Sequence, residues 1–248
     1  MSGLGLGYWK EVIGVLRSII PVYDKVNKSI SLGQDDKYRE SGLRGHISQG
    51  DLILDAGSGF GNMSSKALEI LNDNARVILH DPIREMLNYA QNQNSRRLNL
   101  SCGVFEYMPF KESSVDAVLC GYSLRDSFSL VEAISEVHRV LKNEGRFIIV
   151  DIGKPDNVLL RSFVTFYLKY ILGIIAYSVS GKRGLRFKTL YGTFVRWPKN
   201  ALLNDLLLNK FSKVKFTKKN VWRGNHCRGI QVIYISRARF SIRLIEKK

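Results

Sequence analysis

The chain has 248 residues, which suits one α/β domain with additions, and its hydrophobic fraction of 45% is that of a globular protein. Its first residues, Met1 to Tyr8, are glycine-rich and have no basic n-region, so they do not resemble a secretory signal peptide and predict a cytoplasmic protein. The three cysteines form no CxxC pair, which argues against a disulfide framework or a zinc site and predicts buried thiols and no bound metal.

The basic charge of the chain is large and unevenly distributed. The formal net charge is +16, and residues 210–248 hold twelve Lys or Arg and one acidic residue, Glu246. A basic surface of this kind attracts nucleic acid, anionic lipid or an anionic substrate, and it can also be a solvated face without a partner. The charge alone leaves these alternatives open.

The N-terminal part, residues 1–48, is expected to be helical with breaks. Apolar residues recur at helical spacing from Tyr8 to Ile20, and Pro21 is expected to end that helix. Ser41 to Ile47 then leads to the first strand.

Residues 49–155 alternate between strand-like and helix-like segments. The expected strands are Leu52–Asp55, Val77–Asp81, Leu98–Gly103, Val115–Cys120 and Arg146–Asp151. The expected helices are Asn62–Leu71, Ile83–Asn92 and Leu130–Leu141, the last of them stopped at residues 143–145. Alternation of this kind predicts a mainly parallel sheet with right-handed crossovers.

Residues 156–200 depart from this pattern. Val158–Val179 is strongly apolar, but Arg161 and Lys169 interrupt it, and the uncharged stretch Tyr170–Gly181 is shorter than the ~20 residues of a spanning helix. Membrane spanning is therefore not expected. The segment suits a helical cap over a substrate site or a helix in a membrane interface, and a plain buried helix has the same pattern.

Residues 201–248 are expected to complete the fold. Lys199–Leu208 is typical of a helix, and Val214–Phe216 and Ile230–Ile235 are typical of an antiparallel pair of strands at the sheet edge. The predicted architecture is thus α/β: a Rossmann-like, seven-stranded sheet with N-terminal helices, a helical cap inserted after the fifth strand, and a basic C-terminal tail.

The most informative motif is a glycine-rich turn after the first strand. Asp55 precedes Gly57, Gly59 and Gly61, and Asp81 ends the second strand. Glycines let the backbone approach a ligand closely, and an acidic residue about 20 positions further on can bind both hydroxyls of a ribose. The spacing is GxGxG rather than the GxGxxG of dinucleotide sites, and Asp55 suits the ammonium group of a methionine moiety. The motif therefore favours S-adenosylmethionine over NAD or FAD.

The predicted cofactor contacts of this turn and the second strand form one group. They are Asp55, Gly57, Ser58, Gly59, Phe60, Gly61, Asp81 and Pro82. Both aspartates also have a local alternative, because each precedes a helix and could cap its N-terminus.

The loops after the third and fourth strands supply the remaining candidates. Phe105 is expected to flank the adenine, although it could equally be a core residue, and Glu106 is a further candidate. Gly121 and Ser123 follow the fourth strand, where an open α/β sheet binds its ligands.

Arg125 is placed to hold an anionic oxygen beside the transferred group. Its alternative role is a salt bridge to Asp126 or Asp24.

Several segments together resemble a known family. They are Tyr23-Asp24, Asn27, Ser31, Gly33 and Arg39 in the N-terminal part, Leu54–Gly61, Glu106–Phe110, Tyr122–Arg125, His138–Arg146 and Lys154-Pro155. At these positions the chain resembles the ubiquinone/menaquinone biosynthesis C-methyltransferases, and the resemblance extends over most of the chain. The resemblance implies a class I methyltransferase sheet, S-adenosylmethionine as cofactor, and a small, lipophilic acceptor such as a prenylated quinone precursor. Asp126 stands where that family usually has Asn.

The chemistry that follows is methyl transfer to an electron-rich carbon or oxygen. Arg125 is expected to stabilise the phenolate of a hydroquinone, and Tyr23, Asp126 and His226 are candidate bases or hydrogen-bond partners. Positioning of donor and acceptor in line is expected to supply much of the rate.

Alternative functions stay open. One is methylation of another lipid or metabolite, another is RNA methylation, and a third is a non-enzymatic S-adenosylmethionine-binding subunit that activates a partner. Cys120-Gly-Tyr-Ser replaces the Asn-Pro-Pro-Tyr that favours exocyclic-amine methylation, which makes nucleic acid the weaker alternative. The apolar cap and the basic C-terminal region also suit peripheral membrane contact, and a homodimer is compatible with the sequence.

Overall fold

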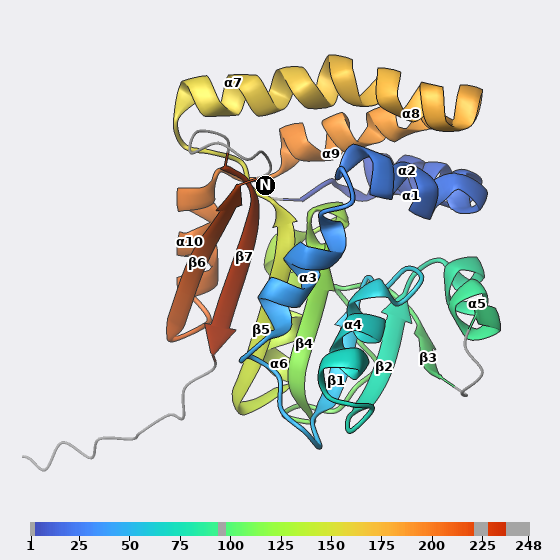
Figure 1. The fold of residues 1–248 in the computed structure, drawn as a ribbon. Helices are drawn as coiled ribbons and strands as arrows, with labels where there is room; N and C mark the ends of the chain where they lie inside the picture. The colour runs from blue at the N-terminus through green and yellow to red at the C-terminus, as the bar shows by residue number, and fades with distance from the viewer. Residues whose placement is uncertain (1–2, 94–97, 221–227, 237–248) are drawn as a thin grey trace, which may run out of the picture.

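A seven-stranded sheet with strand order β3-β2-β1-β4-β5-β7-β6 forms the centre of the molecule (Figure 1). The structure, a computed structural model, describes residues 3–93, 98–220 and 228–236. The strands are β1 (Leu52–Ala56), β2 (Arg76–Asp81), β3 (Asn99–Cys102), β4 (Val115–Gly121), β5 (Leu141–Ile152), β6 (Lys213–Asn220) and β7 (Arg228–Ser236). The first five strands are parallel to one another, and β7 is antiparallel to both β5 and β6.

Helices cover both faces of this sheet. The N-terminal helices are α1 (Leu6–Ile19), η1 (Ile20–Val22), α2 (Tyr23–Ile30) and α3 (Asp35–Leu43). Those between the strands are α4 (Asn62–Ile70), α5 (Arg84–Gln93), η2 (Leu124–Asp126) and α6 (Leu130–Val140). After β5 come α7 (Val158–Phe166), the π-helix η3 (Tyr167–Ile171), α8 (Leu172–Ser180), η4 (Gly181–Lys188), α9 (Thr189–Arg196) and α10 (Asn200–Leu208).

Both faces of the sheet are buried under helices. Neighbouring residues of each strand point to opposite faces and therefore belong to different cores. In β1, Ile53 packs with residues of α3, α4 and α5, whereas Leu54 packs with residues of α6 and α10. Parallel strands covered by helices on both faces have this run of apolar residues. The hydrophobic pattern thus explains the two sheet-facing cores.

A third core lies beyond the carboxyl ends of the strands. There α1 and α2 pack against α8 and α9 through Ile19, Val26, Leu172, Ala176 and Phe194. Figure 1 shows α7 and α8 as one long helix that lies across this end of the molecule, with α1, α2 and α9 between it and the sheet. The N-terminal helices and the helices after β5 therefore form a layer of their own above the sheet edge.

The α/β, Rossmann-like architecture that the sequence predicts is confirmed. Pro21 follows the end of α1 as expected, but the chain continues helically through η1 into α2. The expected helix Leu130–Leu141 ends one residue earlier, at Val140, and β5 begins at once at Leu141, so residues 143–145 lie within the assigned strand.

Among the described residues, the helical stretch Val158–Arg196 is long and apolar enough to cross a membrane by length and composition alone, so the expectation that it does not span one stays a prediction. One expectation about the cysteines needs correction. The expectation of buried thiols holds for Cys120 but not for Cys102, which is exposed at the sheet edge. Cys227 lies outside the described residues.

Candidate active site

A cavity of about 600 Å³ opens at the carboxyl ends of the parallel strands. One part of its wall is polar and comes from the turn after β1 and from the ends of β2 and β4. The other part is apolar and comes from α1 and from the α7–η3–α8 helix. Its volume is within the range of small-molecule sites, and its position is where open α/β sheets bind ligands.

The glycine-rich turn supplies the floor of the polar part. Gly57 has a φ of +65°, and a Cβ at this position would lie 2.5 Å from Cβ of Ser123. Gly61, with a φ of +79°, precedes α4, where a Cβ would lie 2.8 Å from the Leu79 side chain. Side chains at either position would therefore be strained and would collide with their neighbours. The turn needs glycine at both positions in order to place its backbone against the cavity.

Asp55 has one carboxylate oxygen committed to the fold and one free of partners. Its Oδ2 accepts hydrogen bonds from the backbone N–H of Ser64 at 3.0 Å and from the Ser64 hydroxyl at 2.6 Å. Its Oδ1 is buried and has no partner in the structure, and neither has the nearby hydroxyl of Ser58. Burial raises the pKa of Asp55 to about 6, although the hydrogen bonds from Ser64 act to lower it. A buried acceptor without a partner is costly, so this atom marks a place for a ligand donor.

Asp81 is held by two backbone amides. Gly59 N–H donates to Oδ2 and Ile83 N–H donates to Oδ1, both at 2.8 Å. Burial raises the pKa of Asp81 to about 6, despite these hydrogen bonds. Ile83 directly precedes α5, so the second bond forms a turn ahead of the helix and not the expected N-cap. Each carboxylate oxygen accepts more than one hydrogen bond, so the ligand role is compatible with it.

The loops after β3 and β4 close the polar part. Phe105 is buried and belongs to the core on the α6 side, which confirms its expected core role. It also lines the cavity, and its contact with an adenine stays a prediction. Glu106 Oε1 accepts a hydrogen bond from Ser129 N–H at 2.9 Å, which ties this loop to the start of α6. Ser123 Oγ donates to the carbonyl of Ala56 at 3.1 Å.

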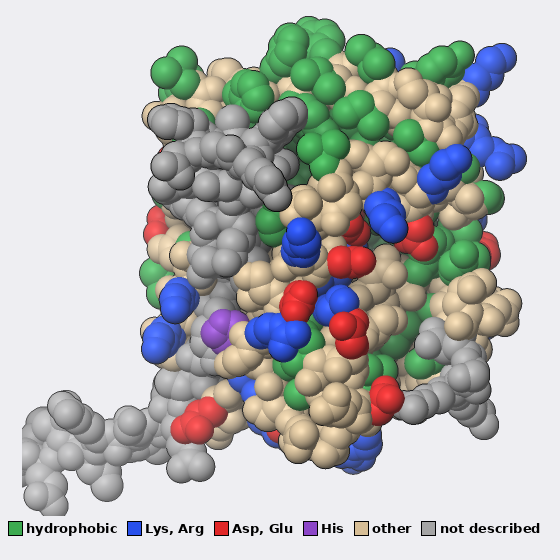
Figure 2. Space-filling view, in the orientation of Figure 1, with side chains coloured by type: hydrophobic (Ala, Val, Ile, Leu, Met, Phe, Trp, Pro, Cys, Tyr) green, Lys and Arg blue, Asp and Glu red, His purple; other side chains and the backbone are tan. Residues whose placement is uncertain are grey.

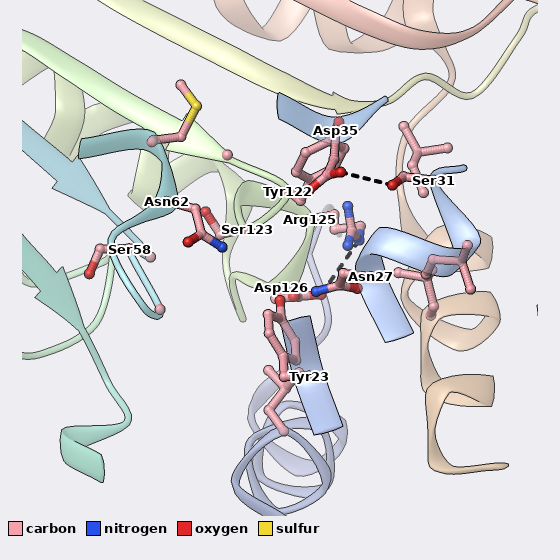
Figure 3. A pocket seen from close by; sticks show the side chains of 18 of the residues that line it. Tyr23, Asn27, Ser31, Asp35, Ser58, Asn62, Tyr122, Ser123, Arg125 and Asp126 are labelled. Carbon is pink, nitrogen blue, oxygen red and sulfur yellow. Dashed lines mark hydrogen bonds and ion pairs between the residues drawn. The ribbon is translucent and has the colours of Figure 1, made fainter. Parts of the chain in front are cut away.

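Four polar side chains meet where the polar and apolar walls join, those of Tyr23, Asn27, Arg125 and Asp126 (Figure 3). Arg125 Nη1 donates to Asp151 at the end of β5, and Arg125 Nε lies 3.9 Å from Asp126 Oδ1. Tyr23 and Asn27 of α2 point toward the same place. The alternative ion pair of Arg125 with Asp126 is present, but Asp151 is the closer partner, and Asp24 instead accepts from Asn62 at 3.3 Å.

Burial controls the protonation of this group. It raises the pKa of Asp126 to about 6, with Arg125 acting in the opposite direction. Burial also raises the pKa of Tyr23, and the Asp126 carboxylate adds to that effect. At neutral pH the tyrosine is therefore a neutral hydrogen-bond donor, while the aspartate titrates close to the working range of a general base.

A second polar group was not singled out as a site by the sequence. Arg39 Nη1 donates to Asp35 Oδ2 at 2.7 Å, and the Arg39 guanidinium lies 5.3 Å from the centre of the Tyr122 ring. Ser31 Oγ donates to Asp35 Oδ1 at 2.9 Å. Tyr122 has a φ of +61°, which is rare for a bulky residue, and its buried hydroxyl has no partner. In the sequence, the position of Tyr122 directly after β4 was the signal that could have marked it as a site residue.

The structure brings nearly all of the predicted site residues to one cavity. The residues that line it are Asp55, Gly57, Ser58, Gly59, Phe60, Asp81, Pro82, Phe105, Glu106, Gly121 and Ser123, together with Tyr23, Arg125 and Asp126. Gly61 does not line the cavity and acts through the start of α4. His226 lies outside the described residues. Over the part of the chain that the structure describes, no group of three or more His, Cys, Asp or Glu side chains could hold a metal ion.

This donor set fits S-adenosylmethionine. The buried Asp55 Oδ1 without a partner suits an ammonium group, the Asp81 carboxylate suits the two hydroxyls of a ribose, and Gly57 and Gly59 bring backbone to the cavity wall. No pyrophosphate-binding GxGxxG is present, and two carboxylates line the turn where a phosphate would need donors. Fold and site together define a class I S-adenosylmethionine-dependent methyltransferase.

Comparison with known proteins gives the particular family. A model of the ubiE/COQ5 methyltransferase family matches residues 7–230, and the chain belongs to that family. A demethylmenaquinone methyltransferase of Oceanobacillus iheyensis is 26% identical over 212 residues, which are 83% of this chain and 89% of the relative. A 2-phytyl-1,4-naphtoquinone methyltransferase of a Nostoc species is 28% identical over 169 residues, which are 65% of this chain and 73% of the relative.

Solved structures show the same fold at low identity. The Burkholderia thailandensis 1,6-didemethyltoxoflavin-N1-methyltransferase, with S-adenosylhomocysteine bound, aligns with a TM-score of 0.58 and 16% identity over 92% of this chain and 90% of its own. An S-adenosylmethionine-dependent methyltransferase of Aquifex aeolicus aligns with a TM-score of 0.56 and 13% identity over 86% of this chain and 97% of its own. These structures confirm the fold, and the family match confirms the resemblance to the ubiquinone/menaquinone biosynthesis C-methyltransferases and with it the expected cofactor.

Proposed function

We propose that this methyltransferase transfers the methyl group to a ring carbon of a prenylated quinol. The observation that carries the proposal is a single cavity with a polar wall at the glycine-rich turn and an apolar wall along α7–η3–α8. Leu160, Val164, Leu168, Leu172 and Ile175 contribute to the apolar wall. A wall of this length suits a prenyl chain, and the names of the relatives from Oceanobacillus and Nostoc describe methylation of prenylated naphthoquinones.

The cofactor residues of the proposal are those of the polar wall. Asp55 would hold the ammonium group, Asp81 the ribose hydroxyls, and Phe105 the adenine ring. S-adenosylmethionine, when bound, supplies an electrophilic methyl group. The remaining contacts in the proposal are Gly57, Ser58, Gly59, Phe60, Gly61, Pro82, Glu106, Gly121 and Ser123.

On the acceptor side we assign one role to each of three residues. Asp126 accepts the hydroxyl proton of the quinol, because burial gives it a pKa of about 6, within reach of proton transfer at neutral pH. The oxyanion that remains makes the ring electron-rich. Arg125 stabilises that charge, and Tyr23, which stays protonated, donates a hydrogen bond to it. The methylated ring carbon then loses its proton to water and the oxygen regains a proton from Asp126, which restores the aromatic quinol.

The helical layer is proposed to enclose this chemistry. Residues 1–48 would act as a lid and residues 156–200 as a cap, since both contribute to the cavity wall and pack on each other: Tyr167 OH donates to the carbonyl of Ile30 at 3.0 Å. A lipophilic acceptor resides in a bilayer, so we also propose that the enzyme works from the cytoplasm at a membrane surface. Exclusion of water from the site would strengthen its electrostatic interactions.

The test is methyl transfer from S-adenosylmethionine labelled with a trideuteromethyl group. The acceptors are a prenylated 1,4-naphthoquinol without a ring methyl group, the corresponding quinone, and total RNA. We expect label on the quinol alone and, by proton NMR, loss of the aromatic C–H signal with both hydroxyls intact. Label on a hydroxyl oxygen would show O-methylation, and label on RNA alone would overturn the proposal.

A further inference from the structure

The helix Val158–Ser180 has an apolar face that no part of the described chain covers. Large side chains at spacings of three or four residues form this outer face: Leu159, Phe163, Phe166, Tyr170, Ile174 and Tyr177. Leu159 is 80% exposed and Ile174 is 67% exposed. Figure 2 shows hydrophobic side chains gathered along the edge of the molecule where α7 and α8 lie. A contiguous exposed apolar surface on a folded protein marks a binding surface.

The opposite face of the same helix is held in the protein. Leu168, Leu172 and Ala176 are at most 2% exposed and belong to the core shared with α1 and α2. Gly181, with a φ of +60°, ends the helix, and Gly184 of η4 packs closely against it. A helix that keeps one face in the protein core lies along a bilayer surface rather than across the bilayer. Its length and hydropathy alone would not distinguish the two placements.

The charge around the outer face has one sign. Between Asn157 and Asn204 the sequence holds eight Lys or Arg and no Asp or Glu. Lys169 extends from the helix itself, with its Nζ 5.0 Å from the centre of the Tyr170 ring, and Lys182 and Arg183 follow the end of the helix, exposed. Apolar and aromatic side chains bordered by cations are the pattern of helices that bind anionic lipid.

A shallow depression on the flank of the outer face extends this pattern. Lys154, Arg161 and Lys169 line it together with the aromatic rings of Tyr170 and Tyr191, and no carboxylate is among its lining residues. Lys154 and Arg161 donate to backbone carbonyls, but no carboxylate lining the depression neutralises the three positive charges, and this charge suits a phosphate group. This is the chemistry of a phospholipid headgroup beside an apolar helix.

The rim of the large cavity reaches the same surface. Phe163 and Ile171 are both exposed, and both line the cavity. The neighbouring positions Leu160 and Val164 continue the lining inward. The cavity is therefore open beside the outer face and not on the far side of the molecule from it.

We propose that the outer face of Val158–Ser180 docks on an anionic lipid bilayer, and that the acceptor passes from this bilayer past Phe163 and Ile171 into the cavity. The docking surface stands on the exposure and charge described above. The entry route rests on the proposed function, because it assumes a lipophilic acceptor.

Docking is tested by flotation of the full-length protein with vesicles of phosphatidylcholine alone or mixed with phosphatidylglycerol. The double variant Leu159→Ser/Ile174→Ser removes two of the most exposed side chains of the outer face and no cavity residue. Its matched control, Leu202→Ser/Leu208→Ser, removes two exposed side chains of α10. We expect the wild type and the control to bind the mixed vesicles and the outer-face variant to lose roughly tenfold or more in partition coefficient.

The charge requirement has its own pair of variants. Lys182→Glu/Arg183→Glu is expected to lower binding to the mixed vesicles, whereas Arg76→Glu/Lys111→Glu, with the same change in net charge at exposed positions elsewhere, leaves it unchanged. Equal binding of all variants, or no binding of the wild type, would overturn the proposal. Wild-type association in solution without lipid, lost in the Leu159/Ile174 variant, would assign the face to a second copy. Protein that resists alkaline carbonate extraction would show a spanning helix.

The entry route is tested with two quinols, one with a long prenyl chain embedded in vesicles and one short and water-soluble. The Leu159→Ser/Ile174→Ser variant is expected to raise KM for the embedded quinol and to leave kcat for the soluble one unchanged. Unchanged KM for the embedded quinol would overturn the route. No turnover of either quinol by the wild type would refute the proposed function, while the flotation result would still decide the docking surface.

Discussion

Burial sets the ionisation of the carboxylates around the cavity. Asp55, Asp81 and Asp126 each have a pKa raised to about 6, with desolvation as the largest cause. Three partly desolvated carboxylates at one site cost folding free energy when ionised, and they are suited to a cationic ligand and to proton transfer. The cost of burial and the function of the site thus have the same origin.

Asp126→Asn is expected to stabilise the protein at neutral pH. The folded-state pKa of about 6 lies above the unfolded value, so the ionised carboxylate destabilises the fold above pH 6, and this penalty disappears as pH falls toward 4. The gain at pH 8 is up to about 3 kcal/mol in the free energy of unfolding, with no gain at pH 4. Urea denaturation at both pH values measures it. An equal gain at pH 4 would show that ionisation is not the cause.

Arg125→Lys is expected to separate turnover from cofactor binding. Lysine keeps a positive charge beside Asp151, whereas alanine would leave that buried carboxylate unpaired. Loss of the guanidinium geometry should lower kcat about 10²-fold or more, with little change in the affinity for S-adenosylmethionine. Calorimetry and steady-state kinetics measure the two effects, and Arg44→Lys, in an exposed ion pair, is the control. Equal loss of both would refute an acceptor-side role.

At the scale of elements, close helix packing builds the wall of the cavity. Gly184 of η4 lies against the carbonyl of Ala176 in α8, so closely that a Cβ at residue 184 would be 1.9 Å from that oxygen. Because the neighbour is backbone, relief would require the two helices to separate. Glycine at position 184 therefore allows η4 to pack directly against the backbone of α8.

Gly184→Ala is therefore expected to destabilise the fold by about 1–3 kcal/mol, the range for overpacking of a close contact. Gly14→Ala is the matched control, since that glycine lies in α1 with no heavy atom within 4 Å of its Cβ position, and alanine is the better helix former. Denaturant unfolding of both variants measures the difference. Similar values for the two variants would mean that the α8–η4 contact gives way without cost.

At the scale of the whole molecule, the cavity lies where separate packing units meet. Its polar wall belongs to the sheet with its two cores, and its apolar wall belongs to the third core, formed by the N-terminal helices and the helices after β5. A ligand that touches both walls holds the two units together. Ligand binding is therefore expected to stabilise the fold as a whole.

S-adenosylmethionine at 100 times its Kd should add about 2.7 kcal/mol to the free energy of unfolding by mass action. For a chain of this length that corresponds to a rise in Tm of roughly 5–10 °C. Thermal scanning measures it, with NADH as the negative control and Asp55→Asn as a variant with a reduced shift at the same concentration. A comparable rise with NADH would contradict the assignment of the site.

The sequence by itself determined the features that depend on local pattern. The strand-helix alternation of residues 49–155, the glycine-rich turn and the two aspartates are local signals, because period, turn chemistry and capping involve residues close together along the chain. They sufficed for the fold class, the cofactor and nearly all residues of the polar wall. The hydrogen bonds that Asp55 and Asp81 accept near the starts of α4 and α5 follow from the same local signals.

Only the tertiary structure decided which distant side chains meet and which surface stays exposed. The ion pair of Arg125 with Asp151 joins the ends of the neighbouring strands β4 and β5. The guanidinium of Arg39, in α3, lies over the ring of Tyr122, which follows β4. The apolar run after β5 gave no indication of which of its faces packs inward. Packing of Leu168 and Leu172 on the N-terminal helices left Leu159 and Ile174 outside. Contacts between segments far apart in the chain are not encoded in local periodicity, which is why the face that we propose docks on a membrane could be located only from the fold.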